Sequence, residues 1–373
     1  MIQGSKKRIY YNSIHASCEN QAFLLSKINT FISTQGLITV DQPDAADVLI
    51  IGSCCVTDSM LNHSETMVKQ FLEKYPEKDI IYFGCAVTLS KSIQSSTHFH
   101  KVSHENITIF NQLFPGEKTI EDAFNYNLFK FREYQEQGYG NDCFVMISQG
   151  CNNNCSYCNI KLVKGSVRSN SIAEIINNIQ NIIATTDNKT ITLLADDCGS
   201  YGIDIGETLP RLIETILGLH PELKVKLYNI FPGFFLEYFT ALSKYIENGK
   251  IVSLTIPVQS GSARILKLMN RNYDLNRLQQ AILTARTFNP TLTITTHMLV
   301  NFPTETLDEA NESLAYAKLF DHTLFIQYGN NTRTKANQYI SLGKEAEQLL
   351  SHKFNIIQQA ITAQVVSGII IKP

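Results

Sequence analysis

Residues 149–160, QGCNNNCSYCNI, place three cysteines in a C-x3-C-x2-C run directly after the apolar segment CFVMIS. A structural zinc site uses four ligands, commonly two pairs, and no second pair lies nearby in this sequence. Three cysteines that hold a cubane iron–sulfur cluster leave one iron open for a substrate or cofactor. The run therefore predicts an iron–sulfur cluster on Cys151, Cys155 and Cys158, with zinc as the alternative.

The chain after this run alternates apolar segments typical of strands with helical patterns. Two helix starts carry the S/T-x-x-E capping box, at Ser171 with Glu174 and at Thr306 with Glu309. Strands joined by helical crossovers indicate a parallel sheet, and strands this apolar favour a barrel. We therefore predict a partial (β/α)6 barrel with its active site at the C-terminal mouth, where the cysteine loop begins. The expected strands lie at 143–148, 190–197, 224–231, 251–258, 291–300 and 322–329.

The N-terminal part predicts a smaller α/β domain, because three apolar runs alternate with helical patterns and indicate a small parallel sheet. Cys18, Cys54 and Cys85 follow these runs, and the carboxyl ends of parallel strands form a binding crevice. They are therefore predicted to bind a second iron–sulfur cluster, with ordinary buried thiols as the alternative. Cys55 is the fallback for Cys54, since neighbours on a strand face opposite sides. The runs lie at 8–14, 47–51 and 80–83.

The composition of the 373 residues is that of a globular protein, with 44% hydrophobic and 18% charged residues. The first residues lack the apolar core of a signal peptide, and no segment approaches a transmembrane helix in length. We therefore expect a cytoplasmic protein without a membrane partner, in which nine cysteines indicate metal or redox chemistry. A net charge of −2 gives no overall basic field, so a nucleic acid would need a local basic patch.

These patterns divide the chain into four predicted segments. An N-terminal domain carries the second cluster, a linker rich in charged and aromatic residues follows, the barrel comes next, and the tail has the pattern of an amphipathic helix. The predicted boundaries are 1–118, 119–142, 143–336 and 337–373.

The cysteine run, with the aromatic Tyr157 before its last cysteine, resembles the radical SAM superfamily, in which the open iron binds the amine and carboxylate of S-adenosylmethionine. Further segments resemble the methylthiotransferases that modify tRNA adenosine or a ribosomal-protein aspartate. The longest, IPVQSGSARILKLMNRNY at 256–273, is nearly a full match to a run specific to that group. The others are HASCEN (15–20), SCCVTDS (53–59), FGCAV (83–87), KGSVRS (164–169), LLADDCGSYG (193–202), LVNFPTET (299–306) and FIQYGNNTRTKA (325–336).

This resemblance implies an enzyme with two 4Fe–4S clusters and S-adenosylmethionine as cofactors. A one-electron reductant such as flavodoxin or ferredoxin would allow the barrel cluster to form a 5′-deoxyadenosyl radical, which removes hydrogen from an unactivated C–H bond. The N-terminal cluster would deliver a methylated sulfur, so that the product carries C–S–CH3.

The resemblance also implies cofactor-binding side chains beyond the cysteines. Two carboxylates and a serine that follow the strand at 190–197 either form a turn or hold polar groups of S-adenosylmethionine. The glutamine and serine of the QSGS run are expected against the nucleoside, and Arg271 beside a carboxylate unless its segment only caps the next helix. The expected cofactor-binding set is Tyr157, Arg168, Asp196, Asp197, Ser200, Gln259, Ser260 and Arg271.

Several positions depart from that family's pattern. Gly52 and Ser53 replace its Asn-Thr pair, Asn301 and Thr304 replace two glycines, and His297 replaces an aspartate. These replacements mark the places where the backbone and the site are expected to differ from the family.

The end of the chain bears on the expected substrate. That family usually ends in a TRAM domain, a small substrate-gripping β-barrel, whereas the segment after Ala336 is short and helical in pattern. Together with the slightly acidic net charge, this leads us to expect a peptide or small-protein side chain as substrate, with tRNA adenosine as the alternative. A non-catalytic iron–sulfur scaffold or electron-transfer protein is the alternative from another class.

Overall fold

The computed structural model describes residues 7–15, 18–94, 96–130, 142–339 and 370–372. These residues form two compact units. The N-terminal unit comprises Met1–Phe144 with Leu162–Lys164, and the C-terminal unit comprises Val145–Lys161 with Gly165–Pro373.

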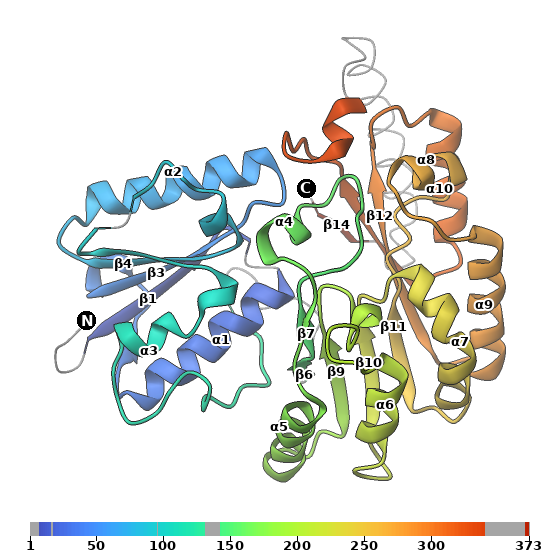
Figure 1. Ribbon diagram of the computed structural model, residues 1–373, viewed down its shortest axis with the longest axis horizontal. Coiled ribbons are helices and arrows are strands. Elements are labelled where there is room, and N and C mark those ends of the chain that lie inside the picture. Colours follow the sequence, from blue (N-terminus) through green and yellow to red (C-terminus); the bar gives the residue numbers. More distant parts are fainter. Residues whose placement is uncertain (1–6, 16–17, 95, 131–141, 340–369, 373) are drawn as a thin grey trace. The chain divides into compact units, whose positions relative to one another are not determined.

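The N-terminal unit is built on a five-stranded sheet in the order β2-β1-β3-β4-β5, in which every pair is parallel. All six residues of β3 are buried, as an apolar parallel strand covered on both faces requires. Figure 1 shows α2 on one face of this sheet and α1 with α3 on the other. The elements are β1 (Arg8–Ser13), α1 (Glu19–Thr34), β2 (Ile38–Thr39), η1 (Pro43–Ala45), β3 (Val48–Ser53), α2 (Asp58–Lys74), β4 (Asp79–Gly84), η2 (Cys85–Thr88), β5 (Phe99–Val102), η3 (His104–Asn106) and α3 (Ile109–Leu113).

The register of this sheet brings the carboxyl ends of three strands to one edge. Ser13 of β1 pairs with Gly52 of β3, and Ser53 pairs with Gly84 of β4. Gly84 has a φ of +118°, and a Cβ there would lie 2.7 Å from the Ser53 carbonyl oxygen, so the position requires glycine. The loops that follow these strands therefore begin beside one another.

Part of the predicted linker belongs to the N-terminal unit. The backbone N–H of Phe129 donates to the Ala22 carbonyl over 2.8 Å, and the Asn125 side chain donates to the Phe23 carbonyl over 3.2 Å. Residues 131–141 of that segment lie outside the described ranges.

The C-terminal unit is built on a seven-stranded sheet in the order β14-β13-β12-β11-β10-β9-β6, with parallel pairing from β9 to β14. All six predicted strands are present, and Figure 1 shows the connecting helices along the outer side of the sheet. The expected α/β class is thereby confirmed. The elements are β6 (Cys143–Met146), β7 (Ser148–Gln149), α4 (Ile160–Lys164), β8 (Arg168–Ser169), α5 (Ile172–Thr185), β9 (Thr190–Leu194), η5 (Cys198–Ser200), α6 (Leu209–Leu217), β10 (Lys224–Tyr228), α7 (Pro232–Glu247), β11 (Ile251–Thr255), α8 (Ala263–Leu268), α9 (Leu275–Phe288), β12 (Thr293–Val300), α10 (Leu307–Ala317), β13 (His322–Gln327), η6 (Lys335–Tyr339) and β14 (Ile370–Lys372).

The two predicted capping boxes are present at the starts of α5 and α10, where Ser171 pairs with Glu174 and Thr306 with Glu309. The helical pattern of the tail, GKEAEQLLSHKFNIIQQAITAQVV, falls at 343–366 and lies outside the described residues. Beyond it, Ile370–Lys372 form β14 and pair with β13.

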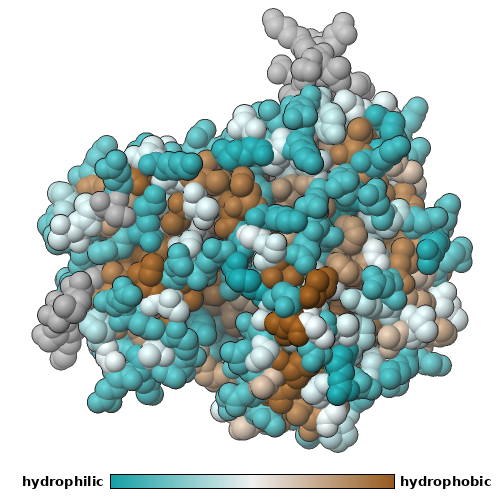
Figure 2. All heavy atoms as spheres, in the orientation of Figure 1, coloured by the Kyte–Doolittle hydropathy of each residue, from teal (hydrophilic) through white to brown (hydrophobic). Residues whose placement is uncertain are grey.

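The surface is polar over most of the face that Figure 2 draws, with small apolar areas. Exposed large apolar side chains include Ile38, Val56 and Leu162. Among the described helices, none combines the length and the apolar character that crossing a membrane demands.

Candidate metal centres

The barrel cysteine loop is anchored by two carboxylates at the end of β9. The Gly150 N–H donates to Asp196 over 2.9 Å, and the Asn153 side chain donates to Asp197 over 2.8 Å. Asp197 also accepts the N–H groups of Gly199 and Phe231, each over 3.0 Å. Both carboxylates therefore hold protein loops, which favours the turn alternative over direct contact with S-adenosylmethionine.

Each sulfur of this loop accepts one N–H group. Cys151 accepts from Asn153 over 3.4 Å, Cys155 from the Arg271 guanidinium over 3.3 Å, and Cys158 from the Ile160 backbone over 3.4 Å. Donors aimed at sulfur stabilise a thiolate, which is the form that binds iron.

Burial acts in the opposite direction on these thiols. It raises the pKa of Cys151 and of Cys158 to about 12. A thiol with so high a pKa is a poor free nucleophile at neutral pH, whereas a metal displaces its proton on binding. The loop therefore suits metal binding better than covalent catalysis by cysteine.

The donor set of this loop also fits a cluster. Thiolates are the ligands that iron–sulfur clusters take, and a cubane on three cysteines keeps one iron open. The three thiols with their N–H donors thus fit a 4Fe–4S cluster with one open iron.

Arg271 brings a buried positive charge to this loop. It is 5% exposed, its guanidinium lies 4.6 Å from the centre of the Phe231 ring, and it donates to the Pro257 carbonyl as well as to Cys155. Its Nε atom is buried without a hydrogen-bond partner. The expected contact with a cofactor carboxylate stays a prediction, and Nε is the atom left available for it.

The other expected cofactor-binding residues differ in placement. Tyr157 is in the cysteine loop and packs edge-on against Phe302, with ring centres 6.4 Å apart. Arg168 is exposed on β8, where it pairs with Gln149. The structure therefore brings Tyr157 and Arg271 to the cysteine loop but leaves Arg168 on the surface.

The serines of the expected set are internal. Ser200 is fully buried and donates to the Asp197 carbonyl over 3.0 Å. Ser260 is also fully buried and lies 3.2 Å from the Ser313 hydroxyl. Gln259 is half-buried with a φ of +79° and bonds through its backbone to β12. Gln259 thus remains a candidate for contact with the nucleoside, whereas Ser200 and Ser260 bond to other loops of the protein.

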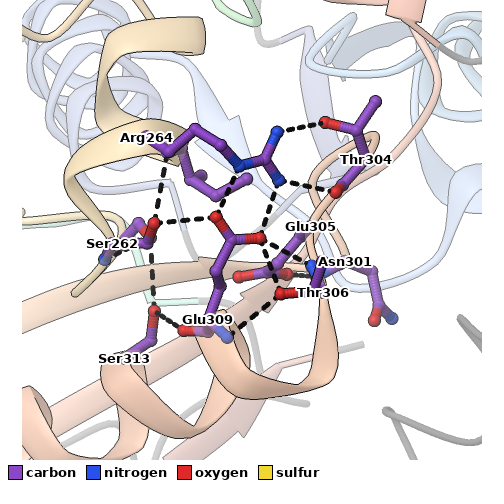
Figure 3. Close-up of polar contacts among 10 residues, drawn as sticks. Ser262, Arg264, Asn301, Thr304, Glu305, Thr306, Glu309 and Ser313 are labelled. Carbon is purple, nitrogen blue, oxygen red and sulfur yellow. Dashed lines mark hydrogen bonds and ion pairs between the residues drawn. The ribbon is translucent and has the colours of Figure 1, made fainter.

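A network beside the QSGS run includes two positions that depart from the family pattern (Figure 3). Asn301 and Thr304 adopt left-handed φ angles of +61° and +68°, where the family has glycine. Arg264 donates to the Thr304 carbonyl over 2.8 Å and to its hydroxyl over 3.3 Å. The arginine therefore holds Thr304 in its unfavourable conformation.

Glu309 fixes Arg264 in that position. Its carboxylate accepts two N–H groups of Arg264, each over 2.7 Å, and the Ser262 hydroxyl over 3.0 Å. Hydrogen bonds from Arg264, with further bonds from Thr306 and Ser262, lower the pKa of Glu309 to about 2 despite partial burial. The QSGS run is thereby tied to α10.

The N-terminal triad lies at the carboxyl edge of its sheet. Cys54 follows β3, Cys85 follows β4, and Cys18 precedes α1 as its N-cap. Burial raises the pKa of Cys18 to about 12 and that of Cys54 to about 11, and the charge of Cys85 adds to both shifts. Cys85 is therefore close enough to affect each of the other two thiols, and the second cluster on this triad stays a prediction.

Cys54 and Cys55 face opposite sides of the chain. Cys55 is 1% exposed and packs in the apolar core with Leu49 and Ile80. The charge of Cys85 acts on Cys54, although Cys85 also packs against the core that contains Cys55, and the Cys54 backbone is fixed by two hydrogen bonds to Ser64. This orientation supports Cys54 as the ligand.

Sequence analysis missed polar side chains around both triads. His104 is 4% exposed, and its Nδ1 lies 3.7 Å from the Cys85 sulfur. Burial lowers the pKa of His104 well below its usual range, so the ring is neutral. Asn153, beside the barrel cysteines, was missed as well. His104 follows β5, a strand that the apolar runs did not predict, and Asn153 is one of the unspecified positions within the cysteine run, so the folded structure was needed to identify both.

Two family descriptions match the chain: the Radical SAM superfamily over residues 145–317, and the Uncharacterized protein family UPF0004 over residues 13–103. Several curated relatives extend across both segments. A probable threonylcarbamoyladenosine tRNA methylthiotransferase of Pyrococcus horikoshii is 27% identical over 75% of this chain and 67% of its own length. The ribosomal protein uS12 methylthiotransferase of Thermotoga maritima is 29% identical over 74% of this chain and 65% of its own length. The two matched segments and these relatives support a methylthiotransferase-like radical SAM family for this chain.

A third relative of this methylthiotransferase-like chain is the tRNA-2-methylthio-N(6)-dimethylallyladenosine synthase of Caldicellulosiruptor saccharolyticus, 26% identical over 88% of the chain. Across the three, the chain spans 65% to 73% of the relative's length. The family consists of enzymes that transfer sulfur-containing groups and use S-adenosylmethionine and 4Fe–4S clusters. The predicted cofactor classes are therefore confirmed.

Solved structures support the fold. The radical S-adenosylmethionine methyltransferase TsrM from Kitasatospora setae, with cobalamin and a 4Fe–4S cluster bound, has a TM-score of 0.57 at 12% identity. The match covers 89% of this chain and 77% of that chain. At this identity the likeness concerns the fold alone.

Proposed function

We propose that this chain is a methylthiotransferase that holds two 4Fe–4S clusters. One would lie on Cys151, Cys155 and Cys158, and the other on the N-terminal triad. The observation that carries the proposal is the presence of two separate cysteine triads, each at the carboxyl edge of a parallel sheet. A non-catalytic scaffold has no need of a second triad.

The bound clusters would supply one-electron cleavage of S-adenosylmethionine and a sulfur atom for transfer, so that an unactivated C–H bond becomes C–S–CH3. The protein's own contribution is position and charge. Asp196 and Asp197 hold the cysteine loop in place, while Arg271 offsets negative charge at Cys155. Phe231 covers the Arg271 guanidinium and excludes water from it.

The substrate we propose is a peptide or small-protein side chain. The net charge of −2 supports this choice, since a folded tRNA is normally bound by an excess of lysine and arginine. The ribosomal protein uS12 methylthiotransferases provide relatives that act on a protein. Transfer to tRNA adenosine is the second candidate, because other relatives are tRNA enzymes. A cytoplasmic location with flavodoxin or ferredoxin as reductant belongs to the same proposal.

Incubation of the anaerobically reconstituted chain with S-adenosylmethionine and dithionite tests the chemistry. The methylthiotransferase should release 5′-deoxyadenosine, whereas an electron-transfer protein or scaffold would release none. The matched control is the Cys151→Ala variant, which should be inactive under the same conditions.

The substrate is tested by mass spectrometry of peptides and tRNA nucleosides from a deletion strain and its complemented parent. The proposal expects a peptide whose mass falls by the equivalent of one SCH2 group in the deletion strain, with tRNA nucleosides unchanged. Loss of a methylthio nucleoside instead would transfer the assignment to tRNA.

A further inference from the structure

Asn301 has a buried side chain that makes no hydrogen bond with the residues that the structure describes. It follows β12 directly, is 4% exposed, and both its Nδ2 and its Oδ1 are buried without a partner in those ranges. Buried amides are nearly always hydrogen-bonded, because removal from water without a new partner is unfavourable. In Figure 3 this side chain points away from the Arg264–Glu309 pair. Its donor and acceptor are therefore available to a bound molecule.

The turn after β12 does not need this side chain. The backbone N–H of Asn301 donates to the Glu305 carboxylate over 2.9 Å, and Arg264 holds Thr304 further along. The φ of +61° is one that glycine adopts freely and that asparagine tolerates better than most residues. Because the family pattern has glycine here, the asparagine adds a carboxamide to a turn that forms without it.

The carboxamide lies at the carboxyl edge of the barrel sheet, where β/α barrels bind their ligands. The next residue, Phe302, packs edge-on against Tyr157 of the cysteine loop, with ring centres 6.4 Å apart. Two residues before Asn301, the Leu299 N–H donates to the Gln259 carbonyl over 2.9 Å. Asn301 is therefore next to the segments expected to surround S-adenosylmethionine and the reacting carbon.

Other buried polar atoms at this edge also have no partner among the described residues. Asn229 directly follows β10, has a φ of +65°, and its Oδ1 is buried without a hydrogen bond. Gln149, just after β6, has a buried Oε1 in the same condition. Since β6, β10 and β12 belong to one sheet, these atoms indicate a polar ligand at its carboxyl edge rather than an isolated defect of packing.

We propose that the Asn301 carboxamide binds a neutral group that presents a hydrogen-bond donor beside an acceptor. A carboxamide donates through its nitrogen and accepts through its oxygen, so it pairs with two complementary atoms on one planar edge. Two molecules of the proposed reaction carry such an edge, namely S-adenosylmethionine in its adenine ring and the peptide substrate in its amide groups. The inference rests on the proposed function and assigns this chain a contact that the family's glycine cannot make.

Asn301→Gly, which restores the residue of the family pattern, tests the assignment in two ways. Binding of S-adenosylmethionine is measured by equilibrium dialysis on the anaerobically reconstituted chain without reductant. The methylthiolated peptide is measured by mass spectrometry in a deletion strain complemented with the parent or the variant. Loss of one or two hydrogen bonds should change the affected readout about 10-fold.

The two readouts distinguish the source of the ligand. If adenine is bound, the dissociation constant of S-adenosylmethionine should rise in Asn301→Gly, and an analogue without the 6-amino group should bind the parent and the variant alike. If a substrate amide is bound, that constant should stay at the parent value while the yield of peptide falls.

Thermal unfolding separates a ligand contact from a structural one. Without ligand, Asn301→Gly should melt at least as high as the parent, because it removes a buried amide that has no partner. Asn289→Ala is the control, since Asn289 is 8% exposed, lies before β12, and accepts the Thr291 N–H over 3.1 Å. It should melt lower and keep both ligand readouts.

Three outcomes are informative against the proposal. An unchanged dissociation constant together with an unchanged peptide yield would overturn it. So would an Asn301→Gly chain that melts below the parent and weakens binding of the 6-amino-free analogue as much as that of S-adenosylmethionine, since the side chain would then be structural. A parent strain without methylthiolated peptide would refute the proposed substrate, and the dissociation constant alone would then decide the role of Asn301.

Discussion

The two cysteine triads are built in opposite ways. The barrel triad lies within residues 151–158, and Asp196, Asp197 and three N–H donors at sulfur hold its loop. The N-terminal triad gathers Cys18, Cys54 and Cys85 from separate segments, so that it exists only when β1, β3 and β4 pair in the correct register. A site of the first kind depends on a loop, and one of the second kind on a whole sheet.

The largest expected effect comes from removing the barrel triad. Replacement of its three cysteines by alanine should reduce the bound iron from about eight atoms to about four and abolish 5′-deoxyadenosine formation, because two cubanes are expected and this one cleaves S-adenosylmethionine. Iron analysis and chromatography of the reaction measure both. Cys143→Ala, at a buried cysteine outside both triads, is the control. Full iron content in the triple variant would refute the ligand assignment.

Removing the N-terminal triad should give a different defect. Alanine at Cys18, Cys54 and Cys85 should also halve the iron, but 5′-deoxyadenosine formation should persist because the barrel loop keeps its own anchors. Methanethiol released by acid, which reports a methylated sulfur on the second cluster, should disappear. Undiminished methanethiol would make these three thiols structural.

Single substitutions at Cys54 and Cys55 test which of these two cysteines binds the N-terminal cluster. Cys54→Ala should lose most iron from the N-terminal site, whereas Cys55→Ala should keep it, because Cys55 faces the apolar core. The Cys55 change removes one buried sulfur and should cost about 1–2 kcal/mol of stability without loss of iron. Iron content and thermal unfolding, measured on both variants, distinguish a lost ligand from a weakened core. Equal iron loss in the two variants would contradict the assignment of Cys54.

The smallest expected effect concerns the stability of the C-terminal unit in acid. Glu309, in the C-terminal unit, has its pKa lowered from 4.5 to about 2 by Arg264 and its other donors. A depressed carboxyl pKa contributes stability that is present above pH 4.5 and is lost as the pH falls toward 2, here about 2–3 kcal/mol. Glu309→Gln should remove this contribution at neutral pH and flatten the acid limb of urea unfolding. Glu312→Gln, exposed on the same helix, should behave as the parent.

The contrast between a triad on one loop and a triad gathered by a sheet also determines how much the sequence could predict. The barrel triad and the six predicted strands β6, β9, β10, β11, β12 and β13 follow from local spacing and apolar patterns, and the capping boxes at Ser171 and Thr306 are equally local. The gathering of Cys18, Cys54 and Cys85 needed only the rule that parallel strands end at one edge. In contrast, His104 reaches Cys85 through tertiary packing, which no local pattern encodes.

Two serines that were expected to bind the cofactor form hydrogen bonds within the protein. Ser200 and Ser260 are polar residues in motif segments, yet both are fully buried and bond to neighbouring loops. A motif shows that a residue type is needed at a position. It does not distinguish a side chain that binds a cofactor from one that supports the loop around it.

The anchoring of the barrel cysteine loop by Asp196 and Asp197 involves no iron. Oxygen destroys exposed 4Fe–4S clusters, and a loop that collapsed with each loss would expose apolar surface and send the chain to proteolysis. Because these carboxylates hold the loop through hydrogen bonds of the protein itself, we expect insertion of a new cluster to restore a damaged molecule without resynthesis of the chain.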